Sequence, residues 1–99
     1  SNNLLVYLSA SSIENLTKLE IIELSQNKLE YLDNDIFQIR PSNLRRIVLS
    51  QNNFKKFDKN LFNLLFNLEF LFLDSNKIAS LESGLFKDLI NLKYLYLFD

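Results

Sequence analysis

The side chains of this chain that could do acid–base chemistry at neutral pH are carboxylates, because the sequence contains no histidine and no cysteine. A Ser-His-Asp triad, a thiolate nucleophile and the standard zinc ligand sets are therefore excluded. The single glycine also excludes phosphate loops and a dinucleotide-binding fingerprint. The remaining enzymatic hypothesis is hydrolysis by paired carboxylates, for which Glu20 and Glu23 are the nominees. Nothing in the sequence predicts the burial that raises a catalytic pKa, so we expect no catalytic site and no cofactor.

The composition describes one small domain without a strong electrostatic preference. The 99 residues are 47% hydrophobic and 23% charged, with a formal net charge of -1, which lies in the range of globular proteins. Nucleic acids and anionic membranes both select a large basic excess, so we expect neither as a partner. No apolar run reaches about 18 residues, which predicts no transmembrane helix and no direct membrane contact in this segment.

A motif of apolar residues and one asparagine recurs three times along the chain. Its period is 25 residues from Leu19 to Leu44 and 24 residues from Leu44 to Leu68. A fixed period of this length indicates small units that stack on one another and share one core. The three copies are Leu19-x-x-Ile22-x-Leu24-x-x-Asn27-x-Leu29, Leu44-x-x-Ile47-x-Leu49-x-x-Asn52-x-Phe54 and Leu68-x-x-Leu71-x-Leu73-x-x-Asn76-x-Ile78.

The motif and its period closely resemble the leucine-rich repeat family. The 24-residue length, with Phe37, Phe62 and Phe86 in one row, is similar to the typical subclass found in secreted proteins and in receptor ectodomains such as those of the Toll type. The resemblance implies an α/β solenoid in a horseshoe arc, with a parallel concave sheet and an irregular or short-helical convex side. We expect one domain over residues 1–99, with full repeats 19–43, 44–67 and 68–91 between partial repeats 1–18 and 92–99. Because the chain opens and stops inside repeats, we expect a fragment of a longer protein with uncapped core ends.

Polar residues also recur in phase within the repeats. Asn27, Asn52 and Asn76 occupy the position where the chain turns away from each strand. The resemblance implies that they form a ladder that satisfies turn backbone groups, and the alternative is an ordinary turn residue. A second recurring position is acidic, and we expect it to cap a short helical turn rather than to bind calcium. Its members are Asp33, Asp58 and Glu82.

The outward positions of the predicted strands form charged and aromatic columns. One column alternates in sign, which predicts ion pairs between neighbouring strands, and Glu30 beside Lys55 on the rim predicts another pair. The alternating column consists of Glu20, Arg45, Glu69 and Lys93. Two further columns run Ile21, Arg46, Phe70, Tyr94 and Glu23, Val48, Phe72, Tyr96.

Aromatic residues accumulate in these last two columns toward the carboxyl end. Outward aromatic side chains bordered by arginine have the composition of a protein-binding hot spot, which Phe98 extends. The alternatives are that aromatic residues simply favour strands, or that flanking segments cover them. The predicted partner-binding residues are Arg46, Val48, Phe70, Phe72, Tyr94 and Tyr96.

These patterns predict a non-catalytic protein–protein recognition module of a secreted or cell-surface protein or receptor ectodomain. Its partner would be a protein ligand or co-receptor, bound at the concave face. Asn15-Leu16-Thr17 is a sequon, so Asn15 is a candidate N-glycosylation site on the convex side. Two alternatives stay open at this point. One is an intracellular scaffold or adaptor in the cytoplasm, and the other is the substrate-selecting region of an enzyme whose catalytic domain lies outside this segment.

Overall fold

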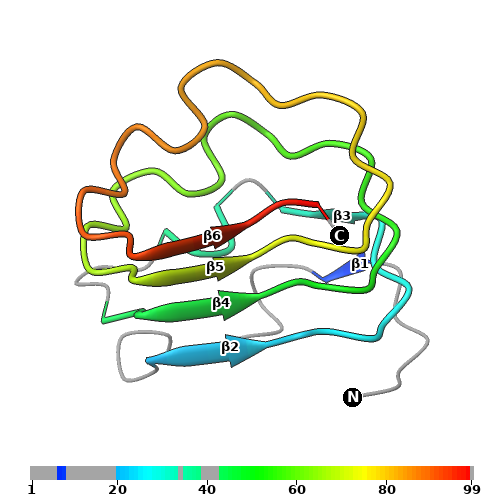
Figure 1. Cartoon of the computed structure of the whole chain (residues 1–99), viewed down its shortest axis with the longest axis horizontal. Coiled ribbons are helices and arrows are strands. Elements are labelled where there is room, and N and C mark those ends of the chain that lie inside the picture. The colour runs from blue at the N-terminus through cyan, green and yellow to red at the C-terminus, as the bar shows by residue number, and fades with distance from the viewer. Residues whose placement is uncertain (1–6, 9–19, 34, 39–42, 99) are drawn as a thin grey trace.

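The computed structural model describes residues 7–8, 20–33, 35–38 and 43–98. The chain winds as a coil in which each turn contributes one strand to a parallel four-stranded sheet (Figure 1). Successive repeats therefore lie side by side, and the segments that return from one strand to the next lie behind the sheet. The strands, in their spatial order, are β2 (Ile21–Glu23), β4 (Arg46–Val48), β5 (Phe70–Phe72) and β6 (Tyr94–Tyr96).

The register of the sheet confirms the predicted columns. Ile21 pairs with Arg46, Arg46 with Phe70, and Phe70 with Tyr94. Residues two positions further along pair in the same way, which places Glu23, Val48, Phe72 and Tyr96 in one row. Alternate residues of a strand point to opposite faces, so both rows share the open face of the sheet.

The core lies between the sheet and the return segments. Ile47 and Leu71 are fully buried at the centres of β4 and β5, and burial of such a side chain stabilises the fold by about 1.5–3 kcal/mol. On the return side the rings of Phe37 and Phe62 lie 6.2 Å apart, and those of Phe62 and Phe86 lie 6.3 Å apart. The repeats are thus held together by apolar rows that run through the whole stack.

The return segments consist of single hydrogen-bonded turns, and the described residues contain no helix. The carbonyls of the acidic column accept the bonds that close these turns, from Ile36 to Asp33, from Leu61 to Asp58 and from Leu85 to Glu82. Asp58 adds a side-chain bond, because its Oδ1 accepts from the Asn60 amide at 2.8 Å. In the described residues the return side is therefore irregular, which is one of the two predicted forms, and it contains no short helix. The horseshoe curvature stays a prediction, since four strands span only a short part of such an arc.

A second, two-stranded sheet was not predicted. It pairs β1 (Tyr7–Leu8) with β3 (Tyr31–Leu32) in parallel. In the following repeat the equivalent residues, Lys56 and Phe57, form no strand. Tyrosine has a higher strand propensity than lysine. The change from Tyr31 to Lys56 at the equivalent position therefore agrees with the end of this sheet at β3.

Candidate functional site

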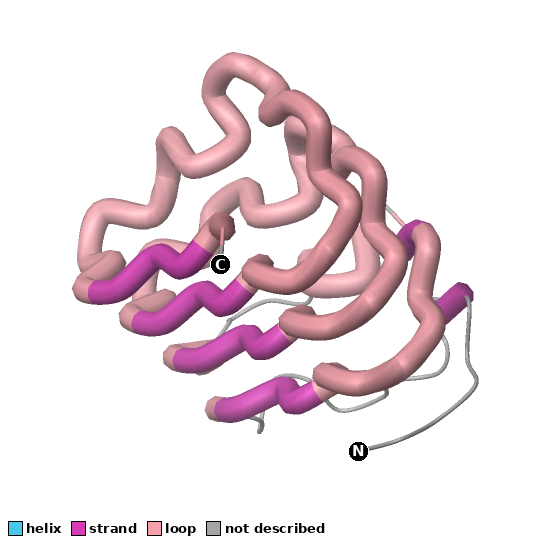
Figure 2. Tube along the Cα trace, turned by 45° about the vertical axis from the view of Figure 1, so that its right-hand side comes forward, coloured by secondary structure: helices cyan, strands magenta, loops and turns pink. Residues whose placement is uncertain are grey.

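The two carboxyl-terminal strands carry four aromatic rings on the open face of the sheet. Figure 2 shows β5 and β6 side by side at one edge of the sheet. Because residues 70 and 72, like residues 94 and 96, are separated by two positions, their side chains leave each strand on the same face. We call these four residues the aromatic platform: Phe70, Phe72, Tyr94 and Tyr96.

The rings of the aromatic platform are nearly parallel. The Phe70 and Tyr94 centroids lie 5.3 Å apart at an interplanar angle of 9°. Phe72 and Tyr96 are closer, at 4.9 Å and 7°. The two tyrosine rings lie 6.4 Å apart and are inclined by 9°. Cross-strand ring pairs contribute about 0.5–1.5 kcal/mol beyond the area that they bury, so the stacking holds the rings in a defined arrangement.

The exposure of the rings differs between the two strands. Tyr94 and Tyr96 are exposed, at 52% and 47%, because β6 is the edge strand. Phe70 and Phe72 face outward as predicted, but they are half-buried. Rings on one side and an arginine on the other flank them and remove part of their surface from water. The accessible part of the aromatic platform is therefore mainly its two tyrosines.

Arg46 lies at the inner end of the aromatic platform. Its guanidinium carbon is 4.8 Å from the Phe70 ring centroid and 5.8 Å from that of Phe72. A cation in this position is attracted by the negative face of the ring. The guanidinium makes no ion pair and no side-chain hydrogen bond with the described residues. Val48 completes this neighbourhood, half-buried and in register with Phe72.

The charged column beside the aromatic platform forms the predicted ion pairs. The nitrogens of Arg45 lie 3.5 Å from Glu20 Oε1 and 3.0 Å from Glu69 Oε1, and Lys93 Nζ lies 3.7 Å from Glu69 Oε2. The hydrogen bond from Arg45 is the main cause that lowers the pKa of Glu69 below its ordinary value. The reciprocal bond with Glu69 raises the pKa of Arg45. We call these four residues the ion column.

The same contacts account for the two carboxylates that were nominated as a catalytic pair. Glu20 is engaged by Arg45, while Glu23 Oε1 accepts a hydrogen bond from the Ser25 amide at 2.6 Å. Both residues are exposed. Each carboxylate is therefore held by its own neighbour, with no sign of the burial or the like-charge contact that prepares a general acid.

The asparagines at the turn link neighbouring repeats. Asn52 Nδ2 donates to the Leu24 carbonyl of the preceding repeat at 2.9 Å, and its Oδ1 accepts from the Leu29 amide at 3.1 Å. Asn76 repeats this arrangement, with a bond to the Leu49 carbonyl at 2.9 Å and one from the Phe54 amide at 3.1 Å. Asn27 Nδ2 donates to the Leu24 carbonyl of its own turn at 2.8 Å. These side chains replace water at buried backbone groups that would otherwise be costly.

The residue before each of these asparagines adopts a left-handed backbone conformation. The φ angles are 59° at Gln26, 58° at Gln51 and 60° at Ser75. Such a conformation costs a residue with a side chain about 1–2 kcal/mol, which the surrounding asparagine bonds offset. Sequence reasoning missed this feature because the position holds no glycine in any of the three repeats.

A second asparagine column was also missed, although its period was visible. Asn43, Asn67 and Asn91 each precede the first leucine of a repeat. Asn91 Nδ2 donates to the Phe66 carbonyl of the preceding repeat at 2.7 Å. The three asparagines line a polar hollow of about 290 Å³ together with Glu20, Arg45 and Glu69. This edge of the sheet therefore offers a polar border to the open face.

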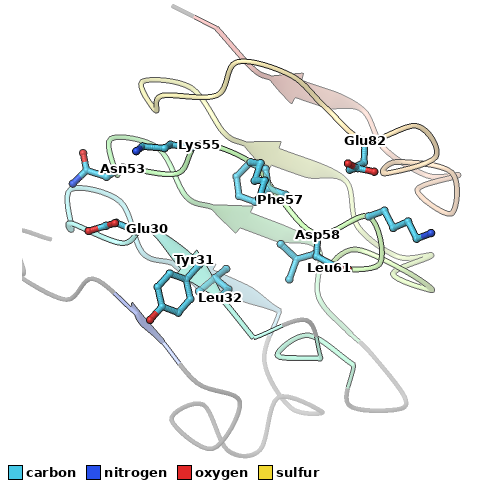
Figure 3. A pocket seen from close by; sticks show the side chains of 11 residues that line it. Glu30, Tyr31, Leu32, Asn53, Lys55, Phe57, Asp58, Leu61 and Glu82 are labelled. Atoms are coloured by element: carbon cyan, nitrogen blue, oxygen red, sulfur yellow. The ribbon is translucent and has the colours of Figure 1, made fainter.

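A larger hollow of about 590 Å³ lies beside β3, on a different part of the surface. Figure 3 shows an apolar middle that includes Tyr31 and Phe57, with Glu30 and Lys55 toward one end and Asp58 toward the other. Three acidic and three basic residues line it, so their formal charges cancel and select no charged ligand. Its full lining is Glu30, Tyr31, Leu32, Asn53, Lys55, Lys56, Phe57, Asp58, Lys59, Leu61 and Glu82.

Two other kinds of site do not occur in the described part of the chain. No three acidic side chains among those residues gather in a group that could hold a metal ion. None of the described segments forms a helix with the length and apolar character needed to cross a membrane. Asn15, the candidate glycosylation site, lies outside the described residues.

Comparisons with known proteins agree with this architecture. The family model described as "Leucine rich repeat" matches residues 42–99, which is 58 of the 99 residues. No curated protein is significantly similar to the chain. The matched region contains three of the four strands of the sheet, both of the interlocking asparagines Asn52 and Asn76, and the whole aromatic platform. The chain therefore belongs to the leucine-rich repeat family.

Proposed function

We propose that this chain is a non-catalytic recognition module that binds a protein partner through the aromatic platform on the concave face of its sheet. The observation that carries the proposal is the arrangement of four nearly parallel rings, two of them tyrosines that are about half exposed. Large rings fixed by stacking can bind a partner at little cost in side-chain entropy. Proteins with leucine-rich repeats generally act as interaction modules, and the proposal places that activity on this face.

The surroundings of the aromatic platform support the proposal. Binding hot spots are enriched in tyrosine and arginine and are surrounded by polar contacts that exclude water. Arg46 supplies the arginine, and the ion column with the second asparagine column supplies a polar border along one side. The open face thus combines an apolar centre with a charged rim, which is the usual anatomy of a protein interface.

We further propose that the module belongs to a secreted or cell-surface protein, as in receptor ectodomains. The support is the similarity of its repeats to the typical 24-residue subclass and the sequon at Asn15. The cytoplasmic alternative predicts the opposite state of Asn15. Its glycosylation in the natural protein is therefore the discriminating observation.

The test is a binding screen of the full chain against a panel of secreted and cell-surface ectodomains. The affinity of each binding protein is then measured for Tyr96→Ala and for Lys55→Ala. Lys55 serves as a control, because it lies in the hollow beside β3, on a different part of the surface. We expect Tyr96→Ala to weaken binding by about tenfold or more, as truncation of a hot-spot residue does. Lys55→Ala should leave the affinity unchanged. Ectodomains that bind Tyr96→Ala as tightly as the wild type, and lose affinity with Lys55→Ala, would exclude the concave face as the interface.

A further inference from the structure

The charge of Arg46 is not neutralised within the described part of the chain. Its guanidinium lies over the rings of Phe70 and Phe72 and forms no side-chain hydrogen bond or ion pair there. The ring faces attract the cation but are not ordinary hydrogen-bond acceptors, so the N–H groups of the guanidinium still need acceptors. Water supplies them in the free protein, and a binding partner would have to replace that water.

The other charged groups that border the aromatic platform already have partners. Lys93 and Arg45 are paired with Glu69 in the ion column. Glu23, in the row of Phe72, accepts from the Ser25 amide. Asp74, which follows β5, accepts from the Ser50 hydroxyl at 2.7 Å and from the Ser75 hydroxyl at 3.5 Å. Glu23 and Asp74 keep their negative charges, because their donors are neutral, whereas Arg46 is a cation of this face that has no carboxylate partner among the described residues.

We propose that the segment bound by the aromatic platform is an acidic peptide, with a carboxylate that pairs with Arg46 and an aromatic or large aliphatic side chain that packs on Tyr94 and Tyr96. This inference rests on the proposed function and names the chemistry of its partner. An arginine edge matches a carboxylate in a bidentate, charge-assisted geometry. The carboxylate meets a cation that is already positioned by Phe70, so little ordering is required.

The sheet also sets the spacing between the two anchor points of the partner. Arg46 lies on β4 and Tyr94 on β6, which are two strands apart. Neighbouring strands are about 4.8 Å apart, so the anchor points are separated by about 10 Å. An extended chain advances by about 3.1–3.4 Å per residue. The acidic and the apolar residue of the partner are therefore about three positions apart.

The inference is tested by selecting random dodecapeptides, displayed on phage, against the full chain. We expect enrichment of Asp or Glu about three positions from an aromatic or large aliphatic residue. One enriched peptide and its analogue with Asn or Gln in place of the acid are then synthesised. Their affinities are measured for the wild type, for Arg46→Gln, and for Lys55→Gln as the matched loss of a positive charge in the hollow beside β3.

The expected pattern is a coupling between the peptide carboxylate and Arg46. Arg46→Gln should lower the affinity for the acidic peptide by about tenfold to a hundredfold, the range for a hydrogen-bonded charged pair. The neutral analogue should bind the wild type and Arg46→Gln about equally, and Lys55→Gln should behave as the wild type. Arg46→Lys should recover only part of the lost affinity, because lysine cannot form the bidentate contact.

Three results would overturn the inference, and they separate it from the proposed function. Selected peptides that depend on Tyr96 but are enriched in Lys or Arg, or in no charge, would overturn the acidic partner alone. Peptides that bind Tyr96→Ala and the wild type with equal affinity would overturn the proposed function too. Sedimentation that shows the chain pairing with itself, and separating upon Tyr96→Ala, would make a second copy the occupant.

Discussion

Asn52 donates a hydrogen bond from its side-chain nitrogen to the carbonyl of Leu24, one repeat earlier, at 2.9 Å. The same nitrogen bonds the Leu49 carbonyl of its own repeat at 3.1 Å. The oxygen of the side chain accepts from the Leu29 amide. The nitrogen also bonds the Ser50 carbonyl at 3.2 Å. One amide thus satisfies four backbone groups in two successive repeats, so the stacking of the repeats depends on this residue.

Asn52→Ala should lower the free energy of unfolding by about 1–3 kcal/mol, because it leaves buried backbone groups without partners. Asn53→Ala is the matched control, since the Asn53 side chain forms no hydrogen bond with the described residues and borders the hollow beside β3. We expect its effect to stay within about 0.5 kcal/mol. Urea denaturation, monitored by circular dichroism, measures the free energy of unfolding of both variants. Equal losses of stability in the two variants would show that the hydrogen bonds of the asparagine ladder do not stabilise the fold.

The ion column should make stability depend on pH in the acidic range. The pKa of Glu69 is lowered in the folded protein, mainly by the hydrogen bond from Arg45. A carboxyl with a depressed folded pKa stabilises the native state above its unfolded pKa, and this contribution is lost as the pH falls through the folded pKa. We therefore expect Glu69→Gln to flatten the decline of stability below pH about 4.3, the ordinary value for glutamate.

The measurement is the urea midpoint as a function of pH for the wild type, Glu69→Gln and Glu82→Gln. Glu82 forms no ion pair with the described residues, so its variant should follow the wild type. Added salt should reduce the difference between Glu69→Gln and the wild type, because exposed ion pairs are screened. Parallel pH curves for all three proteins would show that the ion column has no role in stability.

The aromatic row of the return side should dominate the stability of the stack. Phe62 is fully buried and contacts both Phe37 and Phe86, whereas Phe66, four residues later, is 43% exposed. Phe62→Ala should cost about 3–5 kcal/mol, the range for truncation of a buried phenylalanine. Phe66→Ala should cost clearly less. Thermal and urea unfolding of the pair measure the difference, and comparable losses would contradict the burial seen in the structure.

Glycosylation at Asn15 is expected if the module is exported. The natural protein, isolated from its source, should lose mass upon treatment with a glycosidase that removes N-linked glycans. Asn15→Gln, expressed in the same cells, should lack that mass difference. An unmodified Asn15 in a natural protein that is exported would show that the sequon arises from the asparagine-rich composition, and an unmodified Asn15 in the cytosol would place the module there.

The sequence alone determined the period, and the period determined the register. In a parallel stack of equivalent units, residues at the same position of each unit must lie side by side. The row of Ile21, Arg46, Phe70 and Tyr94 and the ion pairs of Arg45 could therefore be predicted without coordinates. The same logic would have found the second asparagine column, whose period was present in the sequence.

Only the tertiary structure decided how the members of each row contact one another. Whether Arg46 would pair with Glu69 or lie over Phe70 depends on side-chain torsions that the period does not contain. The left-handed conformation of Gln51 and the irregular return turns depend on bonds made to neighbouring repeats, which override local propensity. Repetition sets which residues are neighbours, whereas packing sets which of those neighbours interact and which, like Arg46, stay exposed.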